Sequence, residues 1–438
     1  MIGRYAYLRE RLQTSIWPIP LLMTLLSGLL GALMLWVDRL AWFEDLGPEW
    51  FAMEMEPARQ LLSLIAGSTI GVGGVAFSVT MVALTLTSGQ YGPKILRHFL
   101  EDEASKTSLG LFLGTYVYCL IVLTGFLPGD EPRWTTIMAL TLAVSALISF
   151  VRFTHRTATD LQADEIVHRI GRQLQTSLEQ LVGEASGENG RRHGTLAWRR
   201  QARGHRPVFV AAKQRGYIQT IDYGALCRWC TENDCAMQVR VRAGDFIVAG
   251  SCLLKVYAGD ATTVETSLQM LRETILVGPI RTPVQDPEYP ITQLNQLAAR
   301  ALSPGINDPG TAVTCIDGFS AAVADIVDRD LPGSAFVDEN NVARVLIRQT
   351  TFPGLIKAIY APLRQFATKD VAVNISLMES LCRVADLTTR ERRLHVLAEH
   401  GETIWRAVKA QDFADYDERD IRQRYRRLMS ITTRLRRS

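Results

Sequence analysis

The sequence predicts an α-helical polytopic membrane domain with four spans. A cytosolic α+β region follows, with a small β-barrel-like subdomain and a helical C-terminal subdomain. Three observations predict this fold class. Residues 1–155 contain four long runs without an ionisable side chain. Residues 207–258 hold short strand-like runs separated by turns. In residues 259–438, apolar residues mostly recur at helical spacing. Residues 156–206 are predicted to form a helical stalk and a linker.

Each of the four uncharged runs is long enough to cross a bilayer core of about 30 Å. They cover residues 12–37, 61–93, 107–129 and 134–151. The first run follows three arginines, as a signal peptide would. It is too long for the apolar region of a signal peptide and has no clear small-residue cleavage site, so we interpret it as an uncleaved span.

The distribution of Lys and Arg predicts the orientation of the spans. Eight lie near the N-terminus, in the loop at 94–106 and at the exit of the fourth span, and three lie on the opposite side. Because cytoplasmic loops carry an excess of Lys and Arg, both termini are expected in the cytoplasm. The net charge of +3 gives no case for nucleic acid as a partner.

The second run carries a stripe of small residues. Its members alternate at spacings of four and three, so on a helix they share one face. Such a face either packs closely against a neighbouring helix or lines a pore, and both readings remain open. As a helix the run would be about 50 Å long, which exceeds a bilayer core. The candidate pore-lining residues are Gly67, Gly71, Gly74, Ser78, Met81, Thr85 and Ser88, and the candidate pore-mouth residues are Gln90, Lys94 and Arg97.

Short apolar runs predict the strands of the β-rich subdomain. They cover residues 208–211, 216–221, 236–241, 246–248 and 253–256, with a helix expected over 221–230. Residues 241–256 resemble half of a biotinyl/lipoyl-type barrel but lack the modified lysine between two methionines. The resemblance therefore implies a small barrel without carrier chemistry.

Further helices are expected over residues 264–277, 291–302 and 309–327, and a strand over 342–350. Residues 184–206 are glycine-rich, polar and basic. We interpret them as a solvated linker, with contact to anionic lipid as the alternative.

A turn between two predicted helices contains a candidate polar site. Asp308 before Pro309 fits a helix N-cap, which explains much of this turn structurally. The same helix start, together with polar residues of the 281–286 segment, also suits an anion or another ligand. The candidate residues are Arg281, Gln285, Asp286, Asn307, Asp308 and Thr311.

The cysteine spacing is compared with that of a zinc site. Cys227, Cys230, Cys235 and Cys252 include only one pair with the usual spacing, so ordinary reduced cysteines are the preferred interpretation. No metal or other cofactor is expected. The chain lacks nucleotide-binding, zinc-protease and serine-hydrolase motifs, so it is not expected to be an enzyme.

Several segments together resemble a bacterial family of predicted inner-membrane proteins, domain of unknown function 2254. They are residues 87–103, 109–118, 216–222, 281–286 and 298–312. The resemblance implies a multi-pass protein of the bacterial inner membrane and brings no assigned activity.

The absence of charge in the four runs argues against coupled transport, which usually needs ionisable residues inside the spans. The leading hypothesis is a homo-oligomeric, ring-shaped ion channel with a cytosolic vestibule, whose second span lines the pore. It is expected to be embedded in a lipid bilayer and to pass inorganic ions. The alternative is a non-conducting, membrane-anchored sensor or scaffold whose cytosolic domain binds a ligand or partner.

Overall fold

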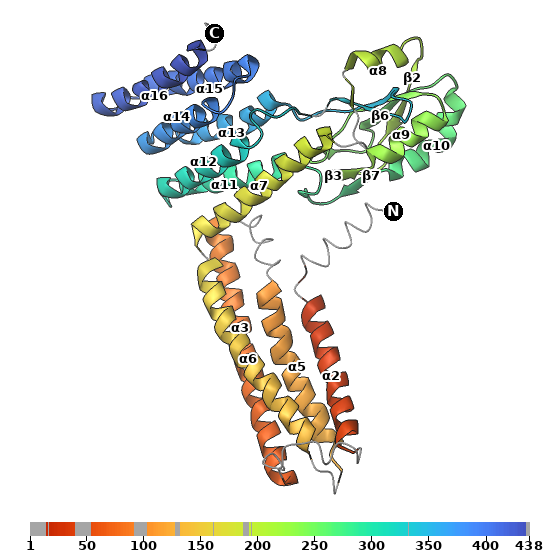
Figure 1. Ribbon diagram of the computed structural model, residues 1–438, viewed down its shortest axis with the longest axis vertical. Helices are drawn as coiled ribbons and strands as arrows, with labels where there is room; N and C mark the ends of the chain where they lie inside the picture. The colour runs from red at the N-terminus through yellow and green to blue at the C-terminus, as the bar shows by residue number, and fades with distance from the viewer. Residues whose placement is uncertain are drawn as a thin grey trace. The chain divides into compact units, whose positions relative to one another are not determined.

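The chain forms two compact units, Met1–Glu165 and Ile166–Ser438. Figure 1 presents the computed structural model. The structure describes residues 15, 17–39, 54–91, 103–127, 132–160, 162–186, 192–193, 195–331 and 333–434.

The first unit consists of four long apolar helices, which confirms the four expected spans by length and composition. They are α2 (Pro18–Asp38), α3 (Met55–Tyr91), α5 (Glu103–Gly125) and α6 (Arg133–Asp160). The helix α5 packs against each of the other three. A buried cluster around Leu62, Tyr118 and Val122 joins them.

Glycines allow α2 and α5 to approach each other closely. A Cβ added at Gly114 would lie 2.5 Å from Ser27 Oγ, and one added at Gly110 would lie 2.6 Å from Met23 Sδ. On the α2 side, a Cβ at Gly31 would lie 3.3 Å from the Tyr118 carbonyl oxygen. In a membrane, where helices gain little from hydrophobic burial, such small residues permit the close packing that holds helices together.

Two charged residues at the end of α2 cap neighbouring helices. The Asp38 carboxylate accepts hydrogen bonds from the Trp134 and Thr135 amides at 2.8 and 3.0 Å, at the start of α6. Arg39 donates to the Gly125 carbonyl at 2.7 Å, at the end of α5. Each charge is complementary to the helix dipole it meets.

The described part of the second unit contains two β-sheets, helices that pack against them and a C-terminal lobe of helices. The larger sheet has the strand order β1-β8-β9-β4-β6-β2, and the smaller has the order β5-β3-β7. All strand pairs are antiparallel except the parallel pair β4 and β9. The strands are β1 (Arg192–His193), β2 (Pro207–Ala211), β3 (Gly216–Ile221), β4 (Ala236–Val239), β5 (Phe246–Ile247), β6 (Cys252–Tyr257), β7 (Ile275–Gly278), β8 (Ala335–Val337) and β9 (Ala343–Leu346).

The expected β-barrel is not confirmed, because among the described residues neither sheet closes on itself. Instead, a core formed by residues such as Ile218, Met237 and Leu254 lies among the sheets, α9 (Tyr223–Glu232) and α10 (Ala261–Glu273). The helix expected over 264–277 ends at Glu273, because Ile275–Gly278 pairs with β3.

The segment expected to be a linker contains a short helix, α8 (Thr195–Gln201). Trp198 of this helix is buried, and its ring lies 5.4 Å from that of Tyr257 in an edge-to-face contact. Burial of this large side chain on the sheet explains why part of a polar, glycine-containing segment becomes ordered.

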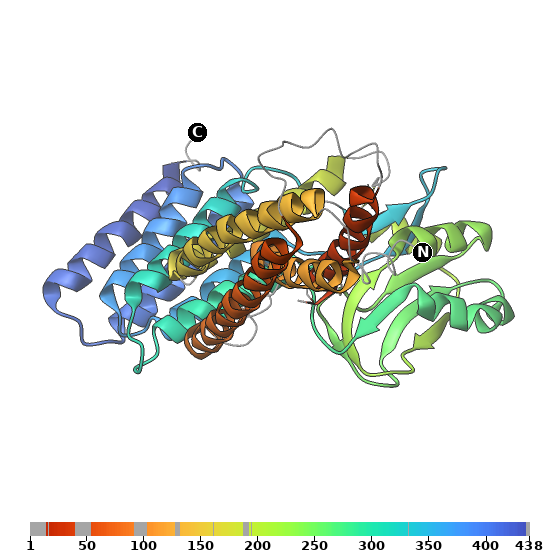
Figure 2. The same ribbon diagram turned by 90° about the horizontal axis from the view of Figure 1, so that it is seen from below.

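The C-terminal part of the second unit is helical, as expected. Figure 2 shows these helices as a lobe separate from the sheets of the same unit. The helices are α11 (Glu288–Ala301), α12 (Pro309–Ala324), α13 (Phe352–Phe366), α14 (Val371–Ala385), α15 (Glu391–Lys409) and α16 (Asp415–Arg434). Buried hydroxyls meet in its core, where Ser380 Oγ lies 2.7 Å from Ser320 Oγ and 2.5 Å from the Tyr360 hydroxyl.

The predicted stalk is a separate helix, α7 (Ala163–Ser186), that begins after α6 has ended. Its buried residues, which include Ile166, Ile170 and Leu174, follow the predicted helical period. Gln175 of α7 donates a 2.5 Å hydrogen bond to Asp325, which follows α12, so α7 packs within the second unit.

Candidate functional site

The predicted stripe on α3 faces away from the helices of its own unit. Gly67, Gly71, Gly74, Ser78 and Thr85 are exposed, and Met81 is 41% exposed. A Cβ added at any of the three glycines would meet nothing within 4 Å. The other face of α3 packs within the unit through Ala58, Leu62, Ile65, Thr69 and Ala76, all of which are buried.

The glycines of α3 therefore behave differently from those of α2 and α5. A Cβ at Gly73, on the packed face, would lie 3.2 Å from the Phe112 Cβ, whereas Gly71 and Gly74 have open space. Among the described residues, the three glycines of the stripe therefore make no contact that requires a small side chain. In this part of the chain the stripe is an exposed face of α3, about 150° around the helix from the packed face.

The stripe extends beyond the residues predicted for it. Ser63, Gln60 and Glu56 continue its spacing toward the start of α3, and all three are exposed. The Gln60 amide lies 3.5 Å from a carboxylate oxygen of Glu56. The three-and-four spacing was the available signal. The charges of Glu56 and Arg59 ended the uncharged run before Gln60 and Glu56, whereas Ser63 lies inside the run and could have been included.

Four predicted residues at the other end of the stripe cannot be placed as side chains. Ser88 and Gln90 belong to α3, but their side chains lie outside the described part. Lys94 and Arg97 lie outside the described residues altogether. Their assignment as stripe and pore-mouth residues stays a prediction.

The six residues of the predicted polar site fall into two groups. Arg281, Gln285 and Asp286 precede α11, and Asn307, Asp308 and Thr311 follow it. The 14 residues of α11 separate the two groups by about 20 Å along its axis. The structure therefore brings together the residues within each group but not the two groups.

The first group belongs to a network of charges. Arg281 is paired with Asp286, whose side chain is 3% exposed. Arg242 forms two hydrogen bonds of 2.6 and 2.8 Å with Glu288, in the first turn of α11. Burial raises the pKa of Asp286 above its ordinary value, against the opposing effect of Arg281. Gly244 has a φ of 90° and lies against this pair so closely that a Cβ would clash with the Asp286 carboxylate.

Gln285 has a structural partner. Its side-chain amide accepts from the Ile221 amide at 2.8 Å and donates to the Ile221 carbonyl at 3.1 Å, which extends the pairing of β3. Nearby, Gln219 donates to the Ile280 carbonyl at 3.0 Å. Gln219 Oε1 and Thr282 Oγ1 are buried without a hydrogen-bond partner among the described residues. Beside the network of charges, the Gln219 oxygen is therefore a free hydrogen-bond acceptor, and the Thr282 hydroxyl is free to donate or accept.

The second group forms the N-cap of α12. Asp308 accepts from the Thr311 amide at 3.1 Å and from the Thr311 hydroxyl at 2.5 Å. These hydrogen bonds, led by that of the hydroxyl, lower the pKa of Asp308. Asn307 has a φ of 50° and an exposed side chain. A helix start already capped by a carboxylate is poorly suited to an anion.

Replacing Asp308 with Ala is expected to destabilise the protein by about 1 kcal/mol, because α12 loses its cap. Thermal unfolding of the purified full chain in detergent measures the effect. Asn307→Gly is the control and should leave stability nearly unchanged, because glycine tolerates positive φ. Equal losses in the two variants would contradict the capping role.

The cysteines do not assemble into a four-ligand site. Cys227 and Cys230 lie on α9, and Cys227 Sγ lies 3.5 Å from the Val337 carbonyl. Cys252 lies on β6, where its Sγ is 3.5 Å from the Leu254 carbonyl. In the described part of the chain, no group of three or more His, Cys, Asp or Glu residues is placed to hold a metal ion.

Four apolar helices and a second α+β unit define a polytopic helical membrane protein. The chain belongs to the family of predicted membrane proteins DUF2254, whose model matches residues 13–383. It is similar to uncharacterized proteins of Mycobacterium tuberculosis and Mycobacterium bovis. Each is 24% identical over 375 residues, covering 83% of this chain and 70% of the relative. No solved structure gives a significant match.

Proposed function

We propose that this membrane protein is the subunit of a homo-oligomeric, ring-shaped ion channel of the bacterial inner membrane. In this proposal α3 faces the axis or a neighbouring subunit with its stripe, both termini are cytoplasmic, and the second unit forms a cytosolic vestibule. The observation that carries the proposal is the exposed stripe on α3, because a Cβ added at any of its three glycines would meet nothing within 4 Å in the described part of the chain.

The chemistry of the stripe is consistent with permeation. The Ser78 hydroxyl donates to the Gly74 carbonyl at 2.9 Å, and the Thr85 hydroxyl donates to the Met81 carbonyl at 2.8 Å. Each hydroxyl hydrogen is thus satisfied by the helix, and the oxygen keeps lone pairs that can accept from water or contact a cation. The spans carry no ionisable side chain in their apolar runs, which favours passive flow over coupled transport.

Bulky side chains flank the stripe on both sides. Ile70 and Phe77 lie on one side, and Val75 and Val82 lie on the other, each at least 40% exposed. A groove of small residues between bulky ridges is a surface into which a helix of a second copy fits. In a ring built from such contacts, the polar residues of the stripe would face the central pore axis or lie at the border of the pore.

Tryptophan at Ser78 or Thr85 is expected to reduce single-channel conductance by at least about tenfold, because the indole fills a narrow pore. Purified protein in planar bilayers measures this. Val144→Trp is the matched control, because Val144 is 52% exposed on a different span, α6, away from the stripe and its flanking side chains. An absence of conductance in the unaltered protein, or an equal loss in all three variants, would refute the proposal.

The alternative is a non-conducting, membrane-anchored sensor or scaffold. The buried, unsatisfied Gln219 Oε1 and Thr282 Oγ1 beside the Arg281–Asp286 pair favour it, since a small polar ligand would supply their missing partners. Particle images separate the two functions. A ring with an axial hole supports the channel, and a monomer or a dimer without one supports the sensor.

A further inference from the structure

A basic surface lies on the sheet of the second unit, beside β2. Residues 189–221 contain eight Lys and Arg and no Asp or Glu. Four of these cations follow one another along the chain, two on α8 and two in the turn that leads into β2. Together with Lys255 on the neighbouring strand they form what we call the basic strip, which comprises Arg199, Arg200, Arg203, Arg206 and Lys255.

The contacts of α8 place this helix on the same face of the larger sheet as Lys255. Tyr257 pairs with Pro207 at the start of β2 and meets the ring of Trp198 on α8. Lys255 pairs with Phe209 two residues along β2, and its Nζ lies 5.3 Å from the centre of the Phe209 ring. Helix α8 therefore lies on the face of the larger sheet that carries the side chains of Phe209 and Lys255.

The four arginines of the strip form no side-chain ion pair or hydrogen bond within the described part of the second unit. All four are exposed, and none has an ion-pair or hydrogen-bond partner in the part of the chain that the structure describes. Elsewhere in the unit, arginines such as Arg383, Arg424 and Arg427 have carboxylate partners within 2.8 Å. Asp260 follows Gly259, where an added Cβ would lie 3.9 Å from the His205 ring, and its carboxylate caps α10 by accepting from the Thr262 amide.

Two large apolar side chains are exposed within the same face. Leu196 on α8 is 73% exposed, and Phe209 on β2 is 56% exposed. Buried Trp198 holds α8 on the sheet, so Leu196 and the arginines project from a fixed base. Basic residues around a few exposed apolar ones are typical of surfaces that bind the interface of an anionic membrane.

We propose that the basic strip, with Leu196 and Phe209, binds the surface of an anionic lipid bilayer. The cations meet the phosphate headgroups, and the two apolar side chains enter the interfacial region. A bilayer fits this face better than nucleic acid does, because the more exposed of its two large apolar side chains is an aliphatic leucine that cannot stack on a base. The spans also keep the second unit tethered to a bilayer, which raises the effective lipid concentration.

The experiment measures binding of the full chain to added vesicles. The protein is held in nanodiscs of pure phosphatidylcholine and floated with vesicles of phosphatidylcholine alone or mixed with phosphatidylglycerol. The unaltered protein should float only with the anionic vesicles and should dissociate at high salt. Replacing the four arginines together with Gln should weaken binding by about 600-fold, nearly three orders of magnitude, because each cation contributes about fivefold.

Three further variants make the result specific. Four Arg→Lys changes at the same positions should preserve binding, because the charge is kept. Leu196→Ser with Phe209→Ser should weaken binding several-fold at unchanged charge. Gln at the exposed Arg392, Lys409, Arg419 and Arg426 removes the same charge elsewhere in the unit and should have little effect.

Three outcomes would overturn the proposal. One is equal loss in both sets of Gln variants, which would mean that overall charge alone drives binding. The second is flotation with neutral vesicles to the same extent. The third is a strip variant that loses binding to labelled oligonucleotides but keeps binding to anionic vesicles, which would assign the strip to nucleic acid. None of these measurements depends on channel conductance.

Discussion

Replacing Gly114 with Leu is expected to abolish the stable, folded form of the first unit. A Cβ at this position would already lie 2.5 Å from Ser27 Oγ and 3.4 Å from the Met23 carbonyl oxygen, so a full leucine side chain forces α2 and α5 apart. Overpacking of this kind typically costs about 1–3 kcal/mol, and more when the backbone has to move. Thermal unfolding in detergent and the yield of monodisperse protein measure the loss.

Gly71→Leu is the matched control, with the same substitution in a neighbouring helix. Its added Cβ meets nothing within 4 Å, so the subunit should fold with a nearly unchanged unfolding temperature. Under the proposed assembly, this variant should instead change the oligomeric mass or reduce conductance. If Gly71→Leu unfolded the isolated subunit as severely as Gly114→Leu, the stripe would have a packing role that the structure does not give it.

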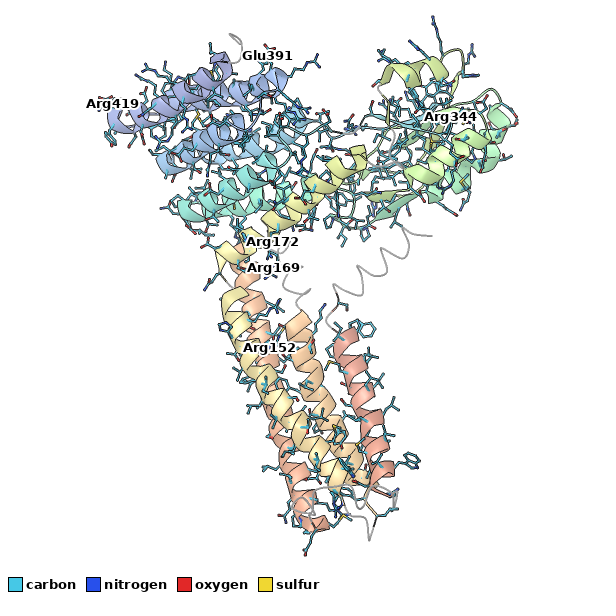
Figure 3. All side chains as sticks on the ribbon, in the orientation of Figure 1. Arg152, Arg169, Arg172, Arg344, Glu391 and Arg419 are labelled. Carbon is cyan, nitrogen blue, oxygen red and sulfur yellow. The ribbon has the colours of Figure 1, made fainter. Side chains whose placement is uncertain are left out.

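Replacing Asp338 with Ala is expected to cost about 3–5 kcal/mol, because it leaves the buried Arg344 without its main partner. The side chains of Arg344 and Asp338 are 10% and 2% exposed, and they are joined at 2.8 Å. Figure 3 labels Arg344 among the sheets of the second unit. The Asp338 carboxylate also accepts from the Asn340 and Val342 amides at 3.0 and 2.9 Å, so the same change loosens the turn between β8 and β9.

Arg348→Ala is the control for Asp338→Ala. Arg348 is 54% exposed and pairs with Asp245 at 2.8 Å, so its loss should cost at most about 1 kcal/mol. Chemical unfolding of the full chain, followed by fluorescence, measures both variants. Comparable losses from the exposed and the buried pair would contradict the assigned importance of Asp338.

The Asp338 pair also predicts a dependence on pH. Burial by itself would raise the pKa of Asp338, but hydrogen bonds from Arg344 and from two backbone amides lower it below its ordinary value of 3.8. A carboxyl group with a lowered pKa stabilises the fold above its unfolded pKa, and this stability is lost as the pH falls through the folded value. The unaltered protein should therefore lose stability below about pH 4 more steeply than Asp338→Ala does.

The spans and most strands could be predicted from local sequence patterns, because the residues of each element are suited to one environment, either the membrane or one face of a sheet. The uncharged run that contains Leu62 and Ala76 is so long and so apolar that it predicts a membrane-spanning helix and excludes a helix exposed to water. The run Gly216–Ile221 forms the strand predicted for it. Long-range pairing decided the exceptions. Ile275–Gly278 became a strand only because β3 lies beside it, and β9 joined β4 across about a hundred residues of sequence.

The candidate sites were also predictable only where a local sequence pattern determined them. The sequence identified Asp308 as a helix cap from its neighbour Pro309, and the structure confirms the cap. It could not indicate that α11 separates Asp286 from Asp308, because the distance between two loops depends on the path of the helix between them. It also missed the basic strip as a surface, since the exposure of Arg199 and Arg203 depends on the anchoring of Trp198 by Tyr257.

The sequence by itself determined that this chain has four spans and a single line of small residues along α3. Only the tertiary structure decided which way that line faces. Spacing places Gly67, Gly71 and Gly74 on one face, but it does not determine which face meets α5 and α6. The side chains of the partner helices decide that, and Phe112 of α5 lies against Gly73 on the opposite face. The stripe is therefore exposed because better packing was available on the other face of α3.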